Sequence, residues 1–208
     1  MAGASLEDWE DIARAPCPAG GDCLYVADIG DNKARRPSVT VYRVPEPAPG
    51  DARSAPAAAL RLRYPDGSHD AEAMFVLGGR IHIVTKGESG PIAVYRAPAD
   101  AAPGAEATLE RVRALSDDKV ARPERITGAD VSPDGRWIAL RTLEAALFYP
   151  ADALMGSGSP SPRRVDLREL DEKQGEGIGF APDGSILLTS EGSKKQPATF
   201  ARLSCTLP

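Results

Sequence analysis

The chain has 208 residues, 42% of them hydrophobic, which is enough to bury a core, and one domain is expected. With 30 acidic and 25 basic residues the net charge is −5, so no basic surface for nucleic acid is expected. Twenty glycines and 19 prolines argue against a helical bundle, and no apolar run reaches the roughly 20 residues of a membrane span.

The first fifteen residues carry two conflicting signals. Residues 1–11 have neither the basic nor the apolar region of a secretory signal, so none is predicted in this sequence. Ser5-Leu6-Glu7-Asp8 resembles a helix capping box, and residues 6, 9 and 12 have helical spacing. However, Glu10-Asp11-Ile12 aligns with three later strand starts. We therefore predict a strand rather than a helix here.

Three cysteines are present. Cys17 and Cys23 flank a turn-rich stretch, and a disulfide between them would close a hairpin loop and indicate an oxidising compartment. The alternative is two reduced thiols in a loop. Cys205 has no partner in the sequence, and the spacing of the three does not fit a zinc site.

Four units repeat the same order of signals. Each has an acidic or small polar start, a turn, an apolar β-rich run, a third strand and, in the first three, a more polar fourth strand. The starts lie at 8–12, 70–74, 127–131 and 174–178, and the β-rich runs at 24–27, 81–84, 137–140 and 186–189. The third strand is nearly literal in two units, Val41-Tyr42-Arg43-Val44-Pro45 and Val94-Tyr95-Arg96-Ala97-Pro98.

This pattern predicts one all-β domain over 1–208, a β-propeller of four-stranded antiparallel blades with units at 8–68, 69–126, 127–173 and 174–208. An unrelated β-sandwich is the alternative. The fourth unit has only three predicted strands. Residues 2–6 could supply its missing strand, or the chain is truncated from a five- or six-bladed parent.

Several motifs resemble a family of uncharacterised bacterial β-propeller proteins. They are Asp8-Trp9-Glu10-Asp11, Asp28-Ile29-Gly30-Asp31-Asn32 and the later Gln174-Gly175-Glu176 and Thr189-Ser190-Glu191-Gly192. The resemblance implies an extracytoplasmic or secreted parent with a signal peptide and one more blade. A more distant similarity to β-propeller phytases and gluconolactonase-like propellers implies calcium or another divalent metal in the channel.

The first strand of each blade lines the channel of a propeller, so equivalent positions face one another there. On the repeat alignment Glu10, Glu72 and Glu176 form a ring interrupted by Ala129, and Asp11 and Asp130 share the next register. Such carboxylates repel unless they are protonated, solvated or neutralised by a cation, and Ca²⁺ suits oxygen ligands. These five acidic residues are the candidate metal ligands.

A second group of polar residues is expected at the rim of the channel. Its members are the candidate ligand-binding residues Asp28, Asp31, Asn32, Lys86, Arg141 and Glu191. A structural ion-pair network is the alternative reading of this mixed rim. His82, between two isoleucines, is expected to be packed or outward-facing rather than functional.

Two functions follow from these features. The first is a monomeric binding or scaffold propeller for a small molecule or protein, with an acidic and metal-binding channel mouth. The second is a metal-dependent hydrolase acting on a phosphoester or lactone, with glutamates 10, 72 and 176 as metal ligands or general bases.

Overall fold

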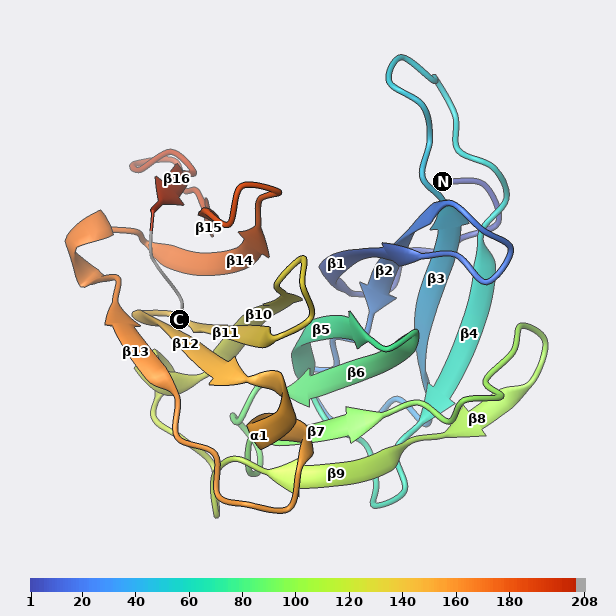
Figure 1. Ribbon diagram of the computed structural model, residues 1–208. Helices are drawn as coiled ribbons and strands as arrows, with labels where there is room; N and C mark the ends of the chain where they lie inside the picture. The colour runs from blue at the N-terminus through green and yellow to red at the C-terminus, as the bar shows by residue number, and fades with distance from the viewer. Residues whose placement is uncertain (205–208) are drawn as a thin grey trace.

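The protein is an all-β propeller of four antiparallel sheets, seen in a computed structural model that describes residues 1–204 (Figure 1). The predicted fold class is confirmed. Sheet 1 contains β1 (Trp9–Pro16), β2 (Asp22–Asp28), β3 (Val39–Pro45) and β4 (Ala58–Arg63), and β8 (Glu106–Thr108) pairs in parallel with β4. Sheet 2 contains β5 (Ala71–Leu77), β6 (Arg80–Thr85), β7 (Ala93–Arg96) and β9 (Glu110–Ala114). Sheet 3 contains β10 (Ile126–Val131), β11 (Trp137–Thr142), β12 (Ala145–Pro150) and β13 (Arg163–Asp166), and sheet 4 contains β14 (Gln174–Phe180), β15 (Ile186–Glu191) and β16 (Phe200–Leu203).

The inner strands are β1, β5, β10 and β14, the first strand of each sheet. β5 contacts both β1 and β10, and β10 also contacts β14. Tight turns send the chain outwards from these strands. In sheet 3, Gly135 takes a φ of +70° and its N–H donates to the carbonyl of Ser132 over 2.8 Å. Gly184 does the same in sheet 4, with a φ of +81° and a bond to the carbonyl of Ala181. The two Pro-Asp-Gly motifs are thus the turns that the sequence predicted.

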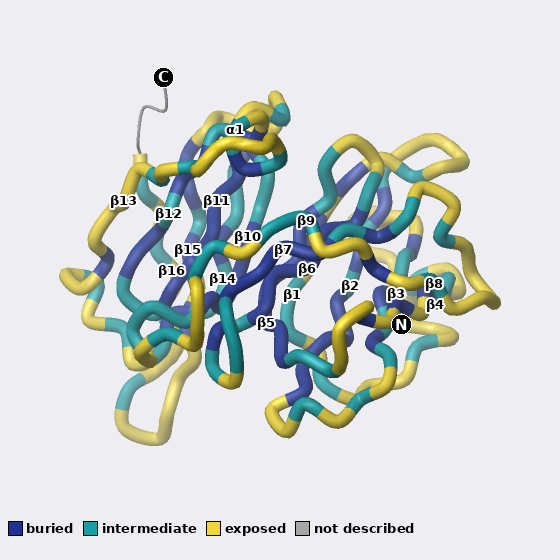
Figure 2. Tube along the Cα trace, turned by 90° about the horizontal axis from the view of Figure 1, so that it is seen from below, coloured by how far each residue is buried: buried dark blue, intermediate teal, exposed yellow. Residues whose placement is uncertain are grey.

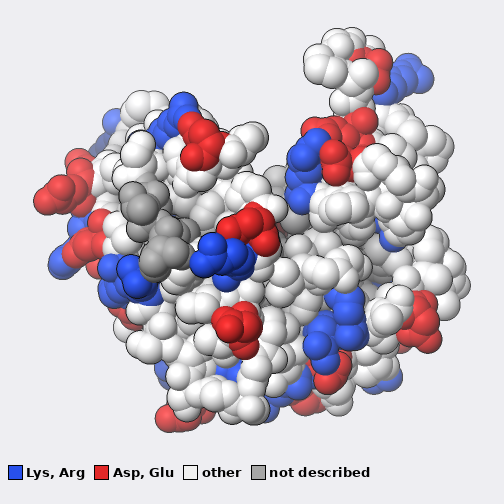
Figure 3. All heavy atoms as spheres, viewed as in Figure 1, with Lys and Arg blue, Asp and Glu red and all other residues white. Residues whose placement is uncertain are grey.

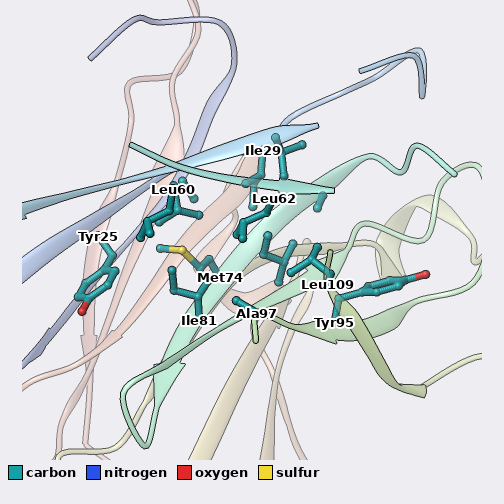
Figure 4. Packing of buried hydrophobic residues seen from close by; sticks show 14 of the residues in the cluster. Tyr25, Ile29, Leu60, Leu62, Met74, Ile81, Tyr95, Ala97 and Leu109 are labelled. Atoms are coloured by element: carbon teal, nitrogen blue, oxygen red, sulfur yellow. The ribbon is translucent and has the colours of Figure 1, made fainter. Parts of the chain in front are cut away.

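The sheets pack face to face through three apolar layers, one between each successive pair. Figure 4 shows the first layer, where Leu60 and Leu62 of sheet 1 pack against Met74 and Ile81 of sheet 2. Similar layers lie between sheets 2 and 3 and between sheets 3 and 4. The strands in the middle of the stack are therefore the most buried (Figure 2).

The N-terminal segment does not complete sheet 4, and the prediction that residues 2–6 would do so is wrong. The N–H of Ala57 donates to the carbonyl of Ala2 over 2.8 Å, and Ser5 bonds to the hydroxyl of Tyr42. Both partners belong to the sheet 1 unit. Tyr42 gives the segment a buried anchor on sheet 1, so the segment covers the outer part of that sheet instead.

The remaining elements are short. They are α1 (Ala151–Met155) and the 3₁₀ turns η1 (Arg122–Glu124) and η2 (Arg168–Leu170). Among the described residues, no helix has the length and hydropathy to span a membrane. Cys17 and Cys23 are joined by a disulfide across the β1–β2 turn, and Cys205 lies outside the described residues.

Candidate functional site

A β-bulge near the start of each inner strand aims one side chain away from the regular ladder. Glu10 is skipped between the pairs Trp9–Asp28 and Asp11–Ala27, and Glu72 is skipped in β5 in the same way. In β14 the bulge contains Glu176 and Gly177. The predicted equivalence of these three glutamates therefore has a structural basis.

The third sheet departs from the alignment by two residues. Its bulge leaves Thr127 unpaired, between the pairs Ile126–Thr142 and Gly128–Arg141. Thr127, rather than Ala129, is thus the structural counterpart of the three glutamates. It follows that Asp11 and Asp130 do not share a register, since Asp130 lies two positions further along its strand than Asp11 does.

Asp11 and Asp130 tie the inner strands together. The carboxylate of Asp11 accepts hydrogen bonds from the N–H groups of Met74 in β5 at 2.8 Å and Ala129 in β10 at 3.2 Å. Asp130 accepts one from Phe180 in β14 at 2.7 Å. Burial raises the pKa of Asp11 to about 8 in spite of these donors, and burial also raises the pKa of Asp130. Repulsion from Asp130 also contributes to the raised pKa of Asp11, so these two carboxylates lie within electrostatic reach of each other.

We call Asp8, Glu10, Asp70, Glu72, Glu88, Glu176 and Lys86 the mouth cluster. Lys86 follows β6, and its ammonium pairs with the carboxylate of Glu72 and lies 3.5 Å from Glu88 and 3.6 Å from Asp70. Burial opposes the charge on Lys86, but the bond to Glu72 and the other two carboxylates raise its pKa to about 12. Lys86 is therefore a firmly charged centre of the cluster.

The glutamates on either side of this centre hold their protons unusually tightly. Burial, with repulsion from Glu72, Asp8 and Asp70, raises the pKa of Glu10 to about 8. Burial and repulsion from Glu72 likewise raise the pKa of Glu176 to about 7, although a hydrogen bond from Gln174 acts against this. Glu72 thus lies within electrostatic reach of both glutamates.

Gly30 makes room for part of the mouth cluster. A Cβ atom at this position would lie 2.3 Å from a carboxylate oxygen of Glu10 and 2.5 Å from the carboxyl of Asp8. Its N–H also donates to the carbonyl of Asp8 over 3.2 Å. The glycine of the Asp-Ile-Gly-Asp-Asn motif is therefore required by close approach to the two acidic residues.

The other predicted rim residues of sheet 1 have mixed surroundings. Asp28 is 1% exposed, lies 3.0 Å from Arg36 and caps the N–H groups of Glu7 and Asp8. Asp31 accepts from the N–H groups of Arg35 and Arg36, and its own N–H donates to Asp70 over 2.8 Å. These two aspartates order the rim by local hydrogen bonds.

Two further rim residues are exposed at the mouth. Asn32 is exposed beside Asp31. Glu191 is exposed on sheet 4 opposite Gln174 and contributes to the raised pKa of Glu176. Both can therefore meet a ligand without rearrangement of the sheets.

Arg141 lies inside the protein and not on the rim. Its side chain is 0% exposed, pairs with Glu172, and donates to the carbonyls of Gly177 and Thr189 at 2.8 and 2.9 Å. Gly175 allows this packing, since a Cβ there would meet the guanidinium at 2.2 Å. Contact with a ligand would require this buried ion pair to open, so the structure gives Arg141 a sheet-joining role.

Sequence reasoning did not select Asp8 or Asp70, and it placed Glu88 among the polar residues of the rim without choosing it as a ligand-binding residue. The first two stand in the acidic starts of units 1 and 2, so the repeat pattern contained the signal for them. Glu88 is positioned by Lys86 and by Arg125, which lies 2.8 Å from it. No sequence spacing links residues 88 and 125.

Comparisons with known proteins support the β-propeller fold. No family model and no curated protein sequence matches the chain. Regucalcin, a calcium-binding protein from Agrobacterium tumefaciens, superposes with a TM-score of 0.50 at 18% identity, covering 94% of this chain and 60% of that one. The periplasmic gluconolactonase of Pseudomonas aeruginosa gives 0.49 at 12% identity, with coverage of 93% and 58%, and a luciferin-regenerating enzyme gives 0.49 at 10%, with 91% and 59%.

The chain thus spans about three-fifths of the length of these three structures. At such low identity the likeness extends to the β-propeller fold alone. The bacterial family suggested by the Asp-Trp-Glu-Asp motif is not identified by any of the comparisons.

Proposed function

We propose that this protein is a binding propeller whose mouth cluster takes up a cationic ligand, with Ca²⁺ as the first candidate. The observation that carries the proposal is the excess of carboxylates around Lys86. Lys86 contacts three of them, whereas in the part of the chain that the structure describes neither Glu10 nor Glu176 forms an ion pair. A bound cation would offset the repulsion that raises their pKa values.

Calcium fits the chemistry of these side chains because it prefers carboxylate oxygens and tolerates irregular geometry. Among residues 1–204, no three His, Cys, Asp or Glu side chains are already grouped to hold a metal ion. The glutamates would therefore have to turn towards one another, displacing Lys86 from Glu72. The propeller fold is compatible with such a site, since regucalcin, which has this fold, is described as a calcium-binding protein.

Thermal unfolding with and without Ca²⁺ tests this proposal. Saturation at about 100 times the dissociation constant stabilises a protein by roughly 2.7 kcal/mol, which raises its Tm by several degrees. We expect EDTA to remove the shift and the Glu10→Gln/Glu176→Gln variant to lack it. Asp117→Asn, an exposed acidic residue outside the cluster, serves as the matched control. An unchanged Tm up to about 10 mM Ca²⁺, roughly ten times the weakest dissociation constant of extracellular calcium modules, would leave the mouth as a structural ion-pair network.

A metal-dependent hydrolase is the second candidate, and the pKa of Glu176 favours it. A carboxyl with a pKa of about 7 is suited to general acid and base catalysis near neutral pH. Hydrolysis of p-nitrophenyl phosphate and of gluconolactone, measured with Ca²⁺ and with the Glu176→Gln variant, tests it. Equal activity of the wild type and the variant would exclude this function for the mouth cluster on these two substrates.

A further inference from the structure

A pocket lies between sheets 1 and 2, at the end of the molecule opposite to the mouth cluster. The mouth cluster lies at the start of β5 and just after β6, whereas this pocket adjoins the turn between the two strands, at Gly79 and Arg80. Its volume is about 290 Å³, close to the roughly 300 Å³ of the smallest pockets that hold small molecules. We call it the basal pocket.

The walls of the basal pocket are largely apolar. Tyr25 and Leu60 of sheet 1 and Ile81 of sheet 2 line it, and all three are buried in the layer that Figure 4 shows. The rest of the lining includes several prolines and alanines. A ligand that fills the pocket therefore needs an apolar body.

Two loops complete the walls, and both are held in place. The segment 98–103 leads from β7 to β8, which pairs with β4, so it bridges sheets 2 and 1 (Figure 1). Arg80 fixes the start of this segment, because its guanidinium donates to the carbonyl of Ala97 over 2.7 and 3.0 Å. Pro18 lies in the loop that the disulfide closes. The pocket is therefore part of the folded structure and needs no rearrangement to form.

Arg43 brings a positive charge into this apolar space. Val39 and Val41 of β3 are buried against sheet 2, and strand alternation places Arg43 on the same face. The side chain of Arg43 is half-buried and lines the basal pocket. Within residues 1–204 this side chain takes part in no ion pair and donates no hydrogen bond. A half-buried guanidinium without a counter-ion favours the binding of an anion.

Sheet 2 shows how the equivalent position is neutralised. Arg96 is the counterpart of Arg43 in the repeated Val-Tyr-Arg motif, and its guanidinium lies 2.7 Å from the carboxylate of Glu110. Glu110 is the cross-strand neighbour of Arg96 in β9. The cross-strand neighbour of Arg43 in β4 is Ala58, which carries no charge. Sheet 1 thus lacks the carboxylate that sheet 2 supplies, and a ligand can provide it.

The charges around the pocket favour a ligand with a single negative charge. Basic side chains lie over the start of β6 and the end of β7, beside the pocket (Figure 3). Asp100, which also lines the pocket, is exposed and would repel a dianion such as phosphate. A carboxylate carries one charge and matches the fork of one guanidinium with two parallel hydrogen bonds. Arg43 is therefore suited to a carboxylate.

We propose that the basal pocket binds a small monocarboxylate with an apolar body. The carboxylate pairs with Arg43, and the apolar body packs between Leu60 and Ile81. The pocket and the mouth cluster share no residue. The proposal therefore does not depend on what the mouth cluster binds.

NMR titration of the isotope-labelled protein with hexanoate tests the proposal. We expect the amide signals of residues 79–81 and 99–102 to shift, and Arg43→Gln to weaken binding roughly tenfold or more, because a charge-assisted contact is lost. Arg53→Gln, at an exposed arginine in the loop between β3 and β4, is the matched control. Hexanol and inorganic phosphate should bind much more weakly than hexanoate, since the first lacks the charge and the second lacks the apolar body.

Ala58→Glu provides a second test that keeps Arg43 in place. Directly opposite residues of neighbouring strands point to the same face, so the new carboxylate should pair with Arg43 as Glu110 pairs with Arg96. We expect this variant to keep the wild-type spectrum in sheets 3 and 4 and to lose hexanoate binding. Equal hexanoate affinity in the wild type, Arg43→Gln and Ala58→Glu, or equal affinity of the wild type for hexanoate and hexanol, would overturn the proposal.

Discussion

Glu10 is a carboxyl that folding places where its charge is disfavoured. Its pKa is about 8 in the folded protein against an ordinary value of 4.5. Between pH 4.5 and 8 the unfolded chain therefore releases a proton that the folded chain keeps, so stability falls as pH rises through this window.

Replacement of Glu10 by glutamine removes this titration. We expect Glu10→Gln to be more stable than the wild type at pH 9, by about 2 kcal/mol after allowance for solvent screening, with little difference at pH 4.5. Urea unfolding at the two pH values measures it, with Asp117→Asn as control. Equal pH dependence in wild type and variant would show that Glu10 is solvated like an ordinary carboxyl.

His82 changes the stability of the fold with pH in the opposite direction to Glu10. It is 2% exposed, stacks on Phe75 with ring centroids 4.7 Å apart, and burial lowers its pKa to about 4, so of the two expected positions, packed or outward-facing, the structure shows the packed one. Below pH 6.5 this histidine becomes protonated in the unfolded chain, whereas in the folded chain it stays neutral until about pH 4. Stability is therefore lost between pH 6.5 and 4, by up to about 3 kcal/mol.

We expect His82→Gln to lose less stability than the wild type when the pH is lowered from 7 to 4.5. The comparison uses the denaturant midpoint of each protein, and His69→Gln reports on the other histidine of the chain. The difference between the two proteins isolates the effect of residue 82 from that of the mouth glutamates. Those glutamates make the folded protein more stable as the pH falls over the same range. A parallel loss in both proteins would contradict the assignment.

At the scale of elements, the Arg141–Glu172 pair holds sheet 3 to sheet 4. Both side chains are almost fully buried, at 0% and 3% exposure. Removing one charge leaves the other unpaired in the interior, and this costs about 3–5 kcal/mol for buried pairs. The exposed pair Arg168–Asp166, with side chains 68% and 52% exposed, should contribute far less because solvent screens it.

We therefore expect Arg141→Met to destabilise the protein far more than Arg168→Met. Adding Glu172→Gln to Arg141→Met should recover part of the loss, because the orphaned charge is removed. Urea unfolding of the three variants measures these differences. Similar effects of Arg141→Met and Arg168→Met would show that the buried pair is not essential to the contact between the sheets.

Some of the strands and turns could be predicted from the sequence, and others could not. The four inner strands, the two Pro-Asp-Gly turns and β1 in place of a helix were predicted, because each rests on a local signal repeated along the chain. The bulge at Thr127 was not, since an inserted residue shifts every later position without changing the hydrophobic pattern. The parallel pairing of β8 with β4 was missed for a related reason, since it depends on two segments far apart in sequence.

The same distinction applies to the residues of the candidate site. Glu10, Glu72 and Glu176 could be placed together because they occupy the same point of a repeat. The burial of Arg141 could not, because a charged residue at the end of a strand is usually exposed and its partner Glu172 comes from a loop. The N-terminal segment was misplaced because its anchor, Tyr42, has no sequence signature.

At the scale of the whole molecule, stability should decrease from the middle sheets to the ends. Sheets 2 and 3 are packed on both faces, and β6 and β11 are almost entirely buried. Within residues 1–204, sheet 4 has three strands and is packed on one face only. Elements with fewer buried contacts open at a lower free energy.

Hydrogen exchange measured by mass spectrometry tests this gradient. In dilute protein we expect the amides of β15 and β16 to exchange faster than those of β6 and β11. Uniform protection across the sheets would mean that the protein opens as a single unit, and that packing on one face only does not weaken sheet 4.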